Sequence, residues 1–361
     1  MRKPRKRLAL LAIALIATAG TLTACTSNGS DSDSTDGGGS GDAIKIGLLL
    51  PESQTARYEE FDRPLFEAHL ATLGDYEVVY ANADQDASKQ QQQAESALTE
   101  GIEVMVLDPV DGAAAASIVA NATAQDVPVI AYDRFIEGGQ VAYYISFDNE
   151  QVGVLQGEAL VERLQADGTT TGIIMINGSP TDGNATLFKK GAHSVIDESG
   201  IPVLAEFDTP DWLAEEAQNF AAGQIGQFGD QISGVYAAND GTAGGAIAAL
   251  RAAGVEPIPP VTGQDAELTG IQRIVAGDQY MTVYKAIKLE AELAAEVADQ
   301  LARGETPEAD TEVDGIPATL LTPVVVTVDN IQDTVIADDF YTVDEICTAE
   351  YADACAAAGL Q

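Results

Sequence analysis

Polar and aromatic side chains stand just after several short apolar segments of this sequence. Carboxylates and carboxamides accept hydrogen bonds, guanidinium and ammonium groups donate them, and flat aromatic faces cover the C–H faces of a ring. A mixture of these groups is what a buried, neutral, polyhydroxylated ligand such as a sugar requires. The residues of this kind are Arg57, Tyr58, Asp133, Arg134, Asn184, Trp212, Asn239, Asp240, Asp265 and Lys285.

The pair Asp133–Arg134 is the most informative of these positions. It ends the apolar run 129–132, and a Gly-Gly turn at 138–139 separates that run from a second one at 143–147. Both runs have the β-branched and aromatic bias of strands. Ligands of doubly wound sheets bind at the carboxyl ends of the strands, where a planar acceptor beside a forked donor suits vicinal hydroxyl groups. Taken by itself, however, the pair could equally be an ordinary ion pair at a strand end.

Motifs for other chemistries are missing from the sequence. Only two histidines are present, His69 and His193, so neither a Ser-His-Asp set nor an HExxH zinc site can be assembled. The sequence has no GxSxG, and the glycines of 238–245 lack the lysine and hydroxyl of a phosphate loop. No cofactor or metal site is predicted. A glycosidase with two carboxylates stays open, because spacing in sequence does not fix the separation of acids in space.

The elements that must position these residues alternate between short strands and amphipathic helices. This pattern predicts an α/β fold with two doubly wound parallel-sheet lobes joined by a three-strand hinge. About 320 residues exceed what one core usually holds, which favours two lobes. We assign 43–147 with 286–318 to an N-terminal lobe and 148–285 with 319–361 to a C-terminal lobe. The predicted strands are 44–50, 77–82, 104–108, 129–132, 143–147, 171–177, 202–208, 234–238, 260–262, 280–283 and 320–328.

The first 42 residues have the layout of an export signal followed by a tether. Five basic residues precede the apolar run 8–20, which is too short to span a membrane, and Leu-Thr-Ala-Cys25 follows. This resembles a bacterial lipobox, which implies cleavage at residue 24 and lipidation of Cys25. Residues 26–42 have almost nothing apolar and predict a flexible tether. The chain is therefore expected outside the cytoplasm, anchored to a membrane by lipid alone.

Charge and cysteine content narrow the partners and the compartment. Residues 1–24 hold five basic residues and no acid, so the mature chain would carry 13 basic and 57 acidic residues, a formal charge of −44. Such a surface repels nucleic acid and anionic lipid. Once Cys25 is lipidated, Cys347 and Cys355 are left. An oxidising compartment favours a disulfide between them, although two free thiols are the alternative.

Between residues 44 and 340 the chain resembles the periplasmic sugar-binding proteins of ABC transporters, type I, and within that family the members that bind D-xylose. The resemblance rests on ordered matches: AYDR (131–134), YISFDNE (144–150), GSP (178–180), ANDGTAGGAIAAL (238–250), GQDAELTGI (263–271), MTVYK (281–285), LLTP (320–323) and DNIQDTVI (329–336). The cysteine tail after Tyr341 lies outside it.

This resemblance implies a role for each matched residue. Arg57, Tyr58, Asp133 and Arg134 would bind the sugar from one lobe, with Tyr58 where the D-xylose binders have tryptophan. Asn184 lies in a loop altered from the family pattern. From the second lobe the resemblance implies Asn184, Trp212, Asn239 and Asp265, with Lys285 on a crossover strand.

The implied activity is capture of a monosaccharide, D-xylose first, and its delivery by a monomer to an ABC transporter permease through hinge closure. Three alternatives stay open: another aldose such as arabinose, ribose, glucose or galactose, a sugar sensor that feeds a signalling receptor, and an enzyme on the same scaffold.

Overall fold

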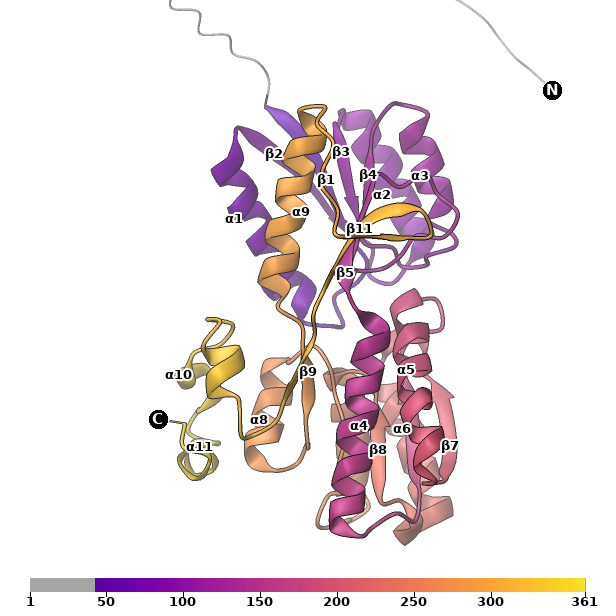
Figure 1. The fold of residues 1–361 in the computed structure, drawn as a ribbon, viewed down its shortest axis with the longest axis vertical. Coiled ribbons are helices and arrows are strands. Elements are labelled where there is room, and N and C mark those ends of the chain that lie inside the picture. Colours follow the sequence, from indigo (N-terminus) through magenta and orange to yellow (C-terminus); the bar gives the residue numbers. More distant parts are fainter. Residues whose placement is uncertain (1–42, 361) are drawn as a thin grey trace, which may run out of the picture. The chain divides into compact units, whose positions relative to one another are not determined.

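The structure is a computed structural model that describes residues 43–360, and Ala43–Gln361 form one compact unit. Its larger sheet has seven strands in the order β10-β11-β5-β4-β3-β1-β2 (Figure 1), parallel except for the β10–β11 pair. We call this sheet and its helices the first lobe. Its strands are β1 (Ile44–Leu50), β2 (Tyr76–Asn82), β3 (Val104–Leu107), β4 (Val129–Tyr132), β5 (Tyr143–Phe147), β10 (Thr311–Val313) and β11 (Ile316–Leu321).

Helices cover both faces of the first sheet. Helices α1 (Arg63–Leu73) and α9 (Ile287–Ala302) pack together over one face, with a π-helical turn η1 (Tyr58–Asp62) leading into α1. Helices α2 (Ala87–Glu100) and α3 (Ala116–Thr123) share a core with the other face. The central strands β3, β4 and β5 are buried along their whole length, as expected for a parallel sheet covered on both faces.

The second lobe is built around a three-stranded parallel sheet, β7-β6-β8. Isolated bridges join it through Val261 and Gln264 to the antiparallel pair β9–β12. Its elements are α4 (Asn149–Asp167), β6 (Ile173–Asn177), α5 (Gly183–Ser199), β7 (Val203–Asp208), η2 (Pro210–Trp212), α6 (Ala214–Phe228), η3 (Gly229–Gln231), β8 (Gly234–Ala237), α7 (Asp240–Ala252), α8 (Leu268–Ala276), β9 (Thr282–Tyr284) and β12 (Val324–Val326).

The chain passes three times between the two lobes, after β5, after β9 and after β11 (Figure 1). Two predicted strands differ from the structure. The predicted strand 320–328 is two strands, because β11 pairs with β5 in the first lobe and β12 pairs with β9 in the second. The predicted strand 260–262 is reduced to one bridge at Val261, where a run of prolines removes backbone donors. Strand β11 continues to Leu321, three residues beyond the predicted lobe boundary at 318/319.

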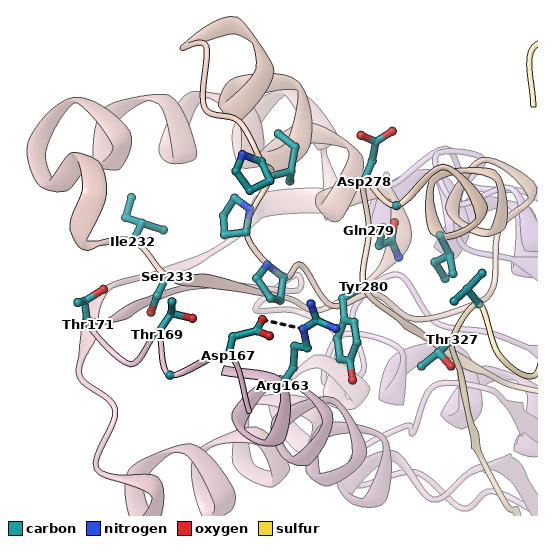
Figure 2. A pocket seen from close by; sticks show the side chains of 18 of the residues that line it. Arg163, Asp167, Thr169, Thr171, Ile232, Ser233, Asp278, Gln279, Tyr280 and Thr327 are labelled. Carbon is teal, nitrogen blue, oxygen red and sulfur yellow. Dashed lines mark hydrogen bonds and ion pairs between the residues drawn. The ribbon is translucent and has the colours of Figure 1, made fainter. Parts of the chain in front are cut away.

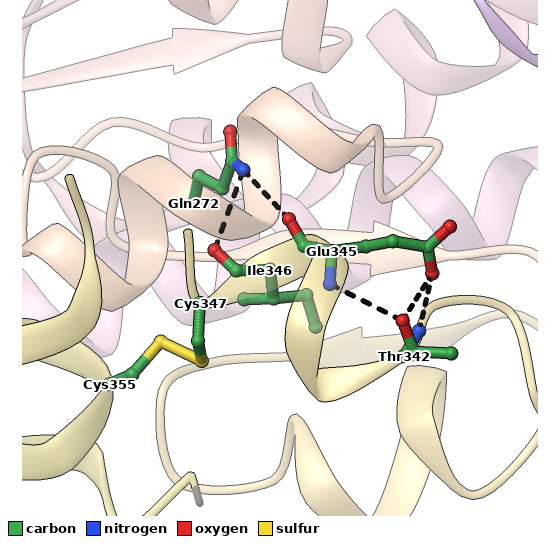
Figure 3. Close-up of a disulfide and its surroundings, with 6 residues drawn as sticks. All are labelled: Gln272, Thr342, Glu345, Ile346, Cys347 and Cys355. Carbon is green, nitrogen blue, oxygen red and sulfur yellow. Dashed lines mark hydrogen bonds between the residues drawn. A yellow bond between two sulfur atoms is a disulfide. The ribbon is translucent and has the colours of Figure 1, made fainter. Parts of the chain in front are cut away.

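The end of the chain forms a small disulfide-closed module on the second lobe. It contains η4 (Gln332–Ile336), α10 (Val343–Ile346) and α11 (Ala352–Ala358), and Cys347 and Cys355 are bonded with their Cα atoms 5.8 Å apart (Figure 3). Gln272 of α8 donates to the carbonyl of Glu345 at 3.1 Å. Phe61 of the first lobe stacks on Phe340 with ring centroids 4.1 Å apart.

Candidate functional site

A narrow polar cavity lies between the lobes, at the carboxyl ends of their parallel strands. Nine of the ten residues singled out in the sequence line it, and each of the nine is at most 6% exposed. The tenth, Asp240, is outside the lining and accepts hydrogen bonds from Gln279 and Thr282. The full lining is Arg57, Tyr58, Asp133, Arg134, Asp182, Asn184, Phe188, Trp212, Asn239, Gln264, Asp265 and Lys285. Cys25 lies outside the described residues.

Local backbone geometry aims the first-lobe residues into the cavity. Arg57 and Tyr58 stand where the β1 loop enters η1, and Asp133 and Arg134 directly follow β4. Asp133 has a φ of 54°, a left-handed conformation that short polar side chains tolerate best. Its backbone N–H still donates to Ile145 of β5 at 2.8 Å, so the turn is held by the sheet itself.

The second-lobe residues come from four separate connections. Asn184 lies in the first turn of α5, Trp212 ends η2, Asn239 caps α7, and Asp265 sits in a turn before α8. The Trp212 ring lies against Gly178, where a Cβ atom would be 2.0 Å from the indole Cη2 atom. A glycine is therefore required for this ring to occupy its place.

The Arg57 guanidinium is almost fully committed to carboxylates. Its Nε and Nη2 bind Asp62 at 2.9 and 2.7 Å, Nη2 also binds Glu290 at 2.7 Å, and Nη1 binds Asp133 at 3.0 Å. Four of its five N–H groups are thus used, and the remaining one, on Nη1, is 3.9 Å from Asp265 in the second lobe. Arg57 holds the acids of the site in place and has little capacity left for a ligand.

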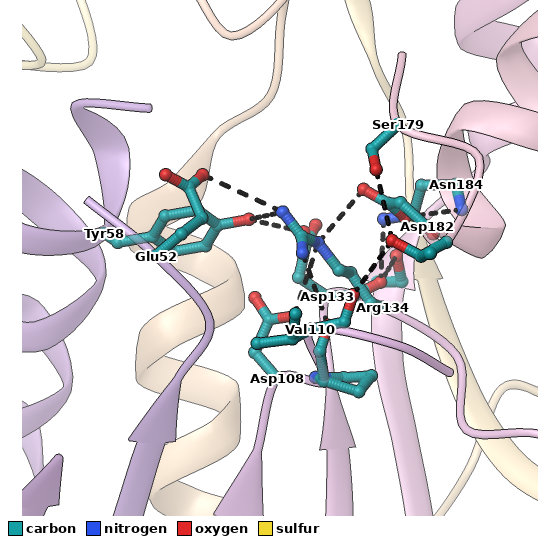
Figure 4. A network of polar contacts seen from close by, with 12 residues as sticks. Glu52, Tyr58, Asp108, Val110, Asp133, Arg134, Ser179, Asp182 and Asn184 are labelled. Atoms are coloured by element: carbon teal, nitrogen blue, oxygen red, sulfur yellow. Dashed lines mark hydrogen bonds and ion pairs between the residues drawn. The ribbon is translucent and has the colours of Figure 1, made fainter. Parts of the chain in front are cut away.

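The Arg134 guanidinium has a looser set of partners (Figure 4). Its Nε atom is 3.0 Å from Asp182 of the second lobe, and its Nη2 donates to the Tyr58 hydroxyl at 3.2 Å. Glu52 and Asp108 of the first lobe lie farther away, at 3.8 and 3.6 Å. Burial raises the pKa of both carboxyls, and the Arg134 charge opposes this only in part.

Asp133 is the anionic centre of the site. Burial alone would raise its pKa, but the charges of Arg57, Lys285 and Arg134 lower the pKa to about 2. Lys285 Nζ lies 3.5 Å from Asp133 and 3.2 Å from Asp265. Burial would lower the pKa of Lys285, yet these two acids raise it, so the ammonium group stays charged. The cavity wall therefore alternates fixed acceptors and fixed donors.

Three lining residues were not singled out from the sequence: Asp182, Phe188 and Gln264. Local signals for them exist, because Phe188 is one helical turn after Asn184, and Asp182 and Gln264 are close neighbours of chosen residues. Four supporting acids were also missed: Glu52, Asp62, Asp108 and Glu290. Glu290 carries no such signal, because it meets Arg57 from 233 residues away.

A second, larger cavity of about 890 Å³ lies in the second lobe around Arg163, Asp167 and Tyr280 (Figure 2). It contains none of the residues predicted for binding, and Arg163 pairs with Asp167 at 2.8 Å instead of facing inward alone. Within residues 43–360, no three His, Cys, Asp or Glu side chains are grouped to hold a metal ion. No helix of this described part is long and apolar enough to cross a membrane.

Two α/β lobes joined by three chain crossings, with a polar cavity between them, define a two-lobed ligand-binding protein. Comparison with known proteins agrees: the family model described as "Periplasmic binding protein domain" matches residues 46–306. The chain belongs to the periplasmic binding protein family, with the type I fold.

Curated relatives and solved structures are similar over most of the chain. The D-xylose-binding periplasmic protein of Escherichia coli is 38% identical over 311 residues, covering 84% of this chain and 92% of the relative. Its namesake in Haemophilus influenzae is 36% identical over 341 residues, covering 92% and 98%. A solute-binding protein from Chloroflexus aurantiacus in complex with D-glucose has a TM-score of 0.78 and 28% identity, covering 84% and 98%.

Proposed function

We propose that this protein is an extracytoplasmic receptor that binds one monosaccharide, D-xylose first among the candidates, and delivers it to an ABC transporter permease. The observation that carries this proposal is the convergence of nine of the ten residues, chosen for their suitability to bind hydroxyl groups, on one buried cavity. The D-xylose-binding relatives, at 36–38% identity, support the choice of sugar.

The charges of the cavity support a neutral ligand. The lining contains three cations, Arg57, Arg134 and Lys285, and three acids, Asp133, Asp182 and Asp265. A charged ligand would upset this balance in a site where charge is costly to bury. A neutral sugar can exchange hydrogen bonds with both signs, and Trp212 and Phe188 offer aromatic faces beside it.

A hexose is the second candidate. Solute-binding proteins solved with glucose are 28–29% identical to this chain, and Tyr58 stands where the resemblance expects a tryptophan. The Tyr58 hydroxyl lies 3.5 Å from Asp133 and 3.2 Å from Arg134. It therefore takes up hydrogen-bonding capacity that a tryptophan would leave to the sugar, which alters the selection among aldoses.

The proposed mechanism is hinge closure, which is established for periplasmic binding proteins as a class. Sugar bound to one lobe would be completed by the other, and binding energy from both lobes would favour the closed state. Discrimination follows because a sugar that lacks a hydroxyl leaves a buried donor or acceptor unpaired. Lipidation of Cys25 would keep the receptor near the permease, and the closed form would present both lobes to it.

Isothermal titration of residues 43–361, which form one compact unit, tests the proposal. The chain is titrated in parallel with xylose, ribose, arabinose, glucose and galactose. One-to-one binding of xylose alone supports the class and the ligand, and tighter binding of a hexose keeps the class while assigning the altered selection to Tyr58. No heat from any of the five sugars would contradict the proposed function.

A further inference from the structure

The loop between β6 and α5 makes a series of contacts with the first lobe. Asp182 Oδ2 is 3.0 Å from Arg134 Nε, and both side chains are 4% exposed. On either side of it, the Thr181 hydroxyl donates to the Val110 carbonyl at 3.4 Å and the Asn184 side chain donates to the Asp133 carbonyl at 3.1 Å. One short segment of the second lobe thus contacts the first lobe at three neighbouring positions beside the cavity.

Asp182 is well supported within its own lobe. Its Oδ1 accepts the Asn184 N–H at 2.8 Å and so caps α5, and its Oδ2 accepts the Trp212 indole N–H at 3.1 Å. Both bonds are made by second-lobe residues, so neither depends on how the lobes meet. The carboxylate would therefore remain in place if the lobes moved apart.

Arg134 also has partners within its own lobe. Glu52 and Asp108 lie within 3.8 Å of the guanidinium, and both Asp108 oxygens lack a hydrogen-bond donor among residues 43–360. The carbonyl of Pro109 and the hydroxyl of Tyr58 accept from Arg134 at 3.3 and 3.2 Å (Figure 4). A cation that leaves Asp182 is thus still surrounded by acceptors, which limits the cost of breaking the pair.

The geometry points to Asp182 as a closure latch: its ion pair with Arg134 holds the lobes together over the cavity and sets how long a bound ligand stays. This inference rests on the proposed function and names a residue that the sequence did not single out. A contact present only in the closed form slows dissociation, while association, which occurs with the open form, changes little. Asp182 is a positioning residue in this scheme, since it acts through Arg134.

The test compares Asp182→Ser with Asp86→Ser in chains of residues 43–361. Serine keeps the capping acceptor in both, and Asp86 caps α2 outside the cavity. Dissociation is followed by stopped-flow fluorescence of Trp212, the single tryptophan. We expect the dissociation rate of the tightest-binding sugar to rise about 10- to 100-fold in Asp182→Ser, as for loss of an ion pair across the lobes whose cation keeps other acceptors, and to stay unchanged in Asp86→Ser.

Arg134→Lys provides the second arm, because lysine keeps a charge but lacks the guanidinium Nε that lies 3.0 Å from Asp182. The effect of Asp182→Ser should shrink in this background. An unchanged dissociation rate in Asp182→Ser would overturn the latch, and so would an effect of equal size in both backgrounds, since Asp182 would then act through Trp212 or α5. If the wild type binds none of the sugars, the proposed function fails separately. Small-angle scattering of the free proteins then decides: a larger radius of gyration for Asp182→Ser than for Asp86→Ser supports the latch, and equal radii overturn it.

Discussion

Replacing Arg57 by methionine should destabilise the ligand-free protein by about 3–5 kcal/mol at pH 7, the range for removing one partner from a buried ionic cluster. Methionine fills much of the same volume but leaves Asp62, Asp133 and Glu290 without their shared cation. All three carboxylates are at most 2% exposed. Water therefore cannot replace the lost interactions without opening the first lobe.

The magnitude can be checked against one of these acids. Lowering the pKa of Asp133 from 3.8 to about 2 corresponds to roughly 2 kcal/mol. Among the three cations that lower the pKa of Asp133, Arg57 has the largest effect. Asp62 and Glu290 are almost fully buried and lose the same cation, which places the expected loss in the range for breaking a buried ionic cluster.

The loss should depend on pH in a defined direction. In the wild type, the lowered pKa of Asp133 contributes stability that is complete above about pH 3.8 and disappears as the pH falls toward 2. In Arg57→Met, Asp133 keeps Lys285 and Arg134 but loses the cation with the largest effect, so the pKa of this buried carboxyl should rise. The folded variant then takes up protons on acidification, so the difference from the wild type should be largest near pH 8 and smaller at pH 5.

Urea denaturation followed by circular dichroism at pH 5, 7 and 8 measures this difference. Arg251→Met is the matched control, because Arg251 pairs with Asp278 at the surface and is 56% exposed, and its loss should cost about 1 kcal/mol or less. A loss in Arg57→Met no larger than in this control would refute the reasoning. A large loss that is the same at pH 5 and pH 8 would refute the electrostatic part of it.

Three further predictions concern other parts of the molecule. Gly178→Ala should displace Trp212, shift its fluorescence emission and weaken sugar binding at least tenfold. Gly183→Ala, where a Cβ atom meets nothing within 4 Å, should leave sugar affinity and the emission spectrum unchanged. Equal behaviour of the two variants would count against the packing argument. Burial raises the pKa of Asp240 to about 7, so the folded state holds a proton that the unfolded state releases. The free energy of unfolding should therefore fall as the pH rises from 5 to 8. An equally steep fall in Asp240→Asn would show that other groups cause the pH dependence. Reducing the Cys347–Cys355 disulfide should lower the free energy of unfolding by about 2–3 kcal/mol. Hydrogen exchange should then show α11 losing its protection while the first lobe keeps its own. Continued protection of α11 after reduction would contradict this prediction.

Local sequence patterns determined much of the fold. Apolar runs such as 44–50 form strands. Helix α2 begins after the capping residue Asp86 and ends at Gly101, which has the left-handed conformation typical of a helix end. The site residues could be chosen in the same way, because each follows a predicted strand or lies in the connection after it. Parallel strands bring their carboxyl ends to one edge, so residues distant in sequence converge there. This is why the nine chosen residues line one cavity.

Only the tertiary structure decided what those side chains do for one another. Arg57 meets Glu290 and Arg134 meets Asp182, and neither pairing follows from periodicity or turn chemistry, since both depend on how separate layers pack. The same reason explains the run 320–328, which reads as one strand but is divided between two sheets. The sequence determined which groups reach the cavity, because strand ends are a local property. The packing of the lobes determined which groups neutralise each other and which remain for a ligand, because ion pairs between distant segments are a property of the whole fold.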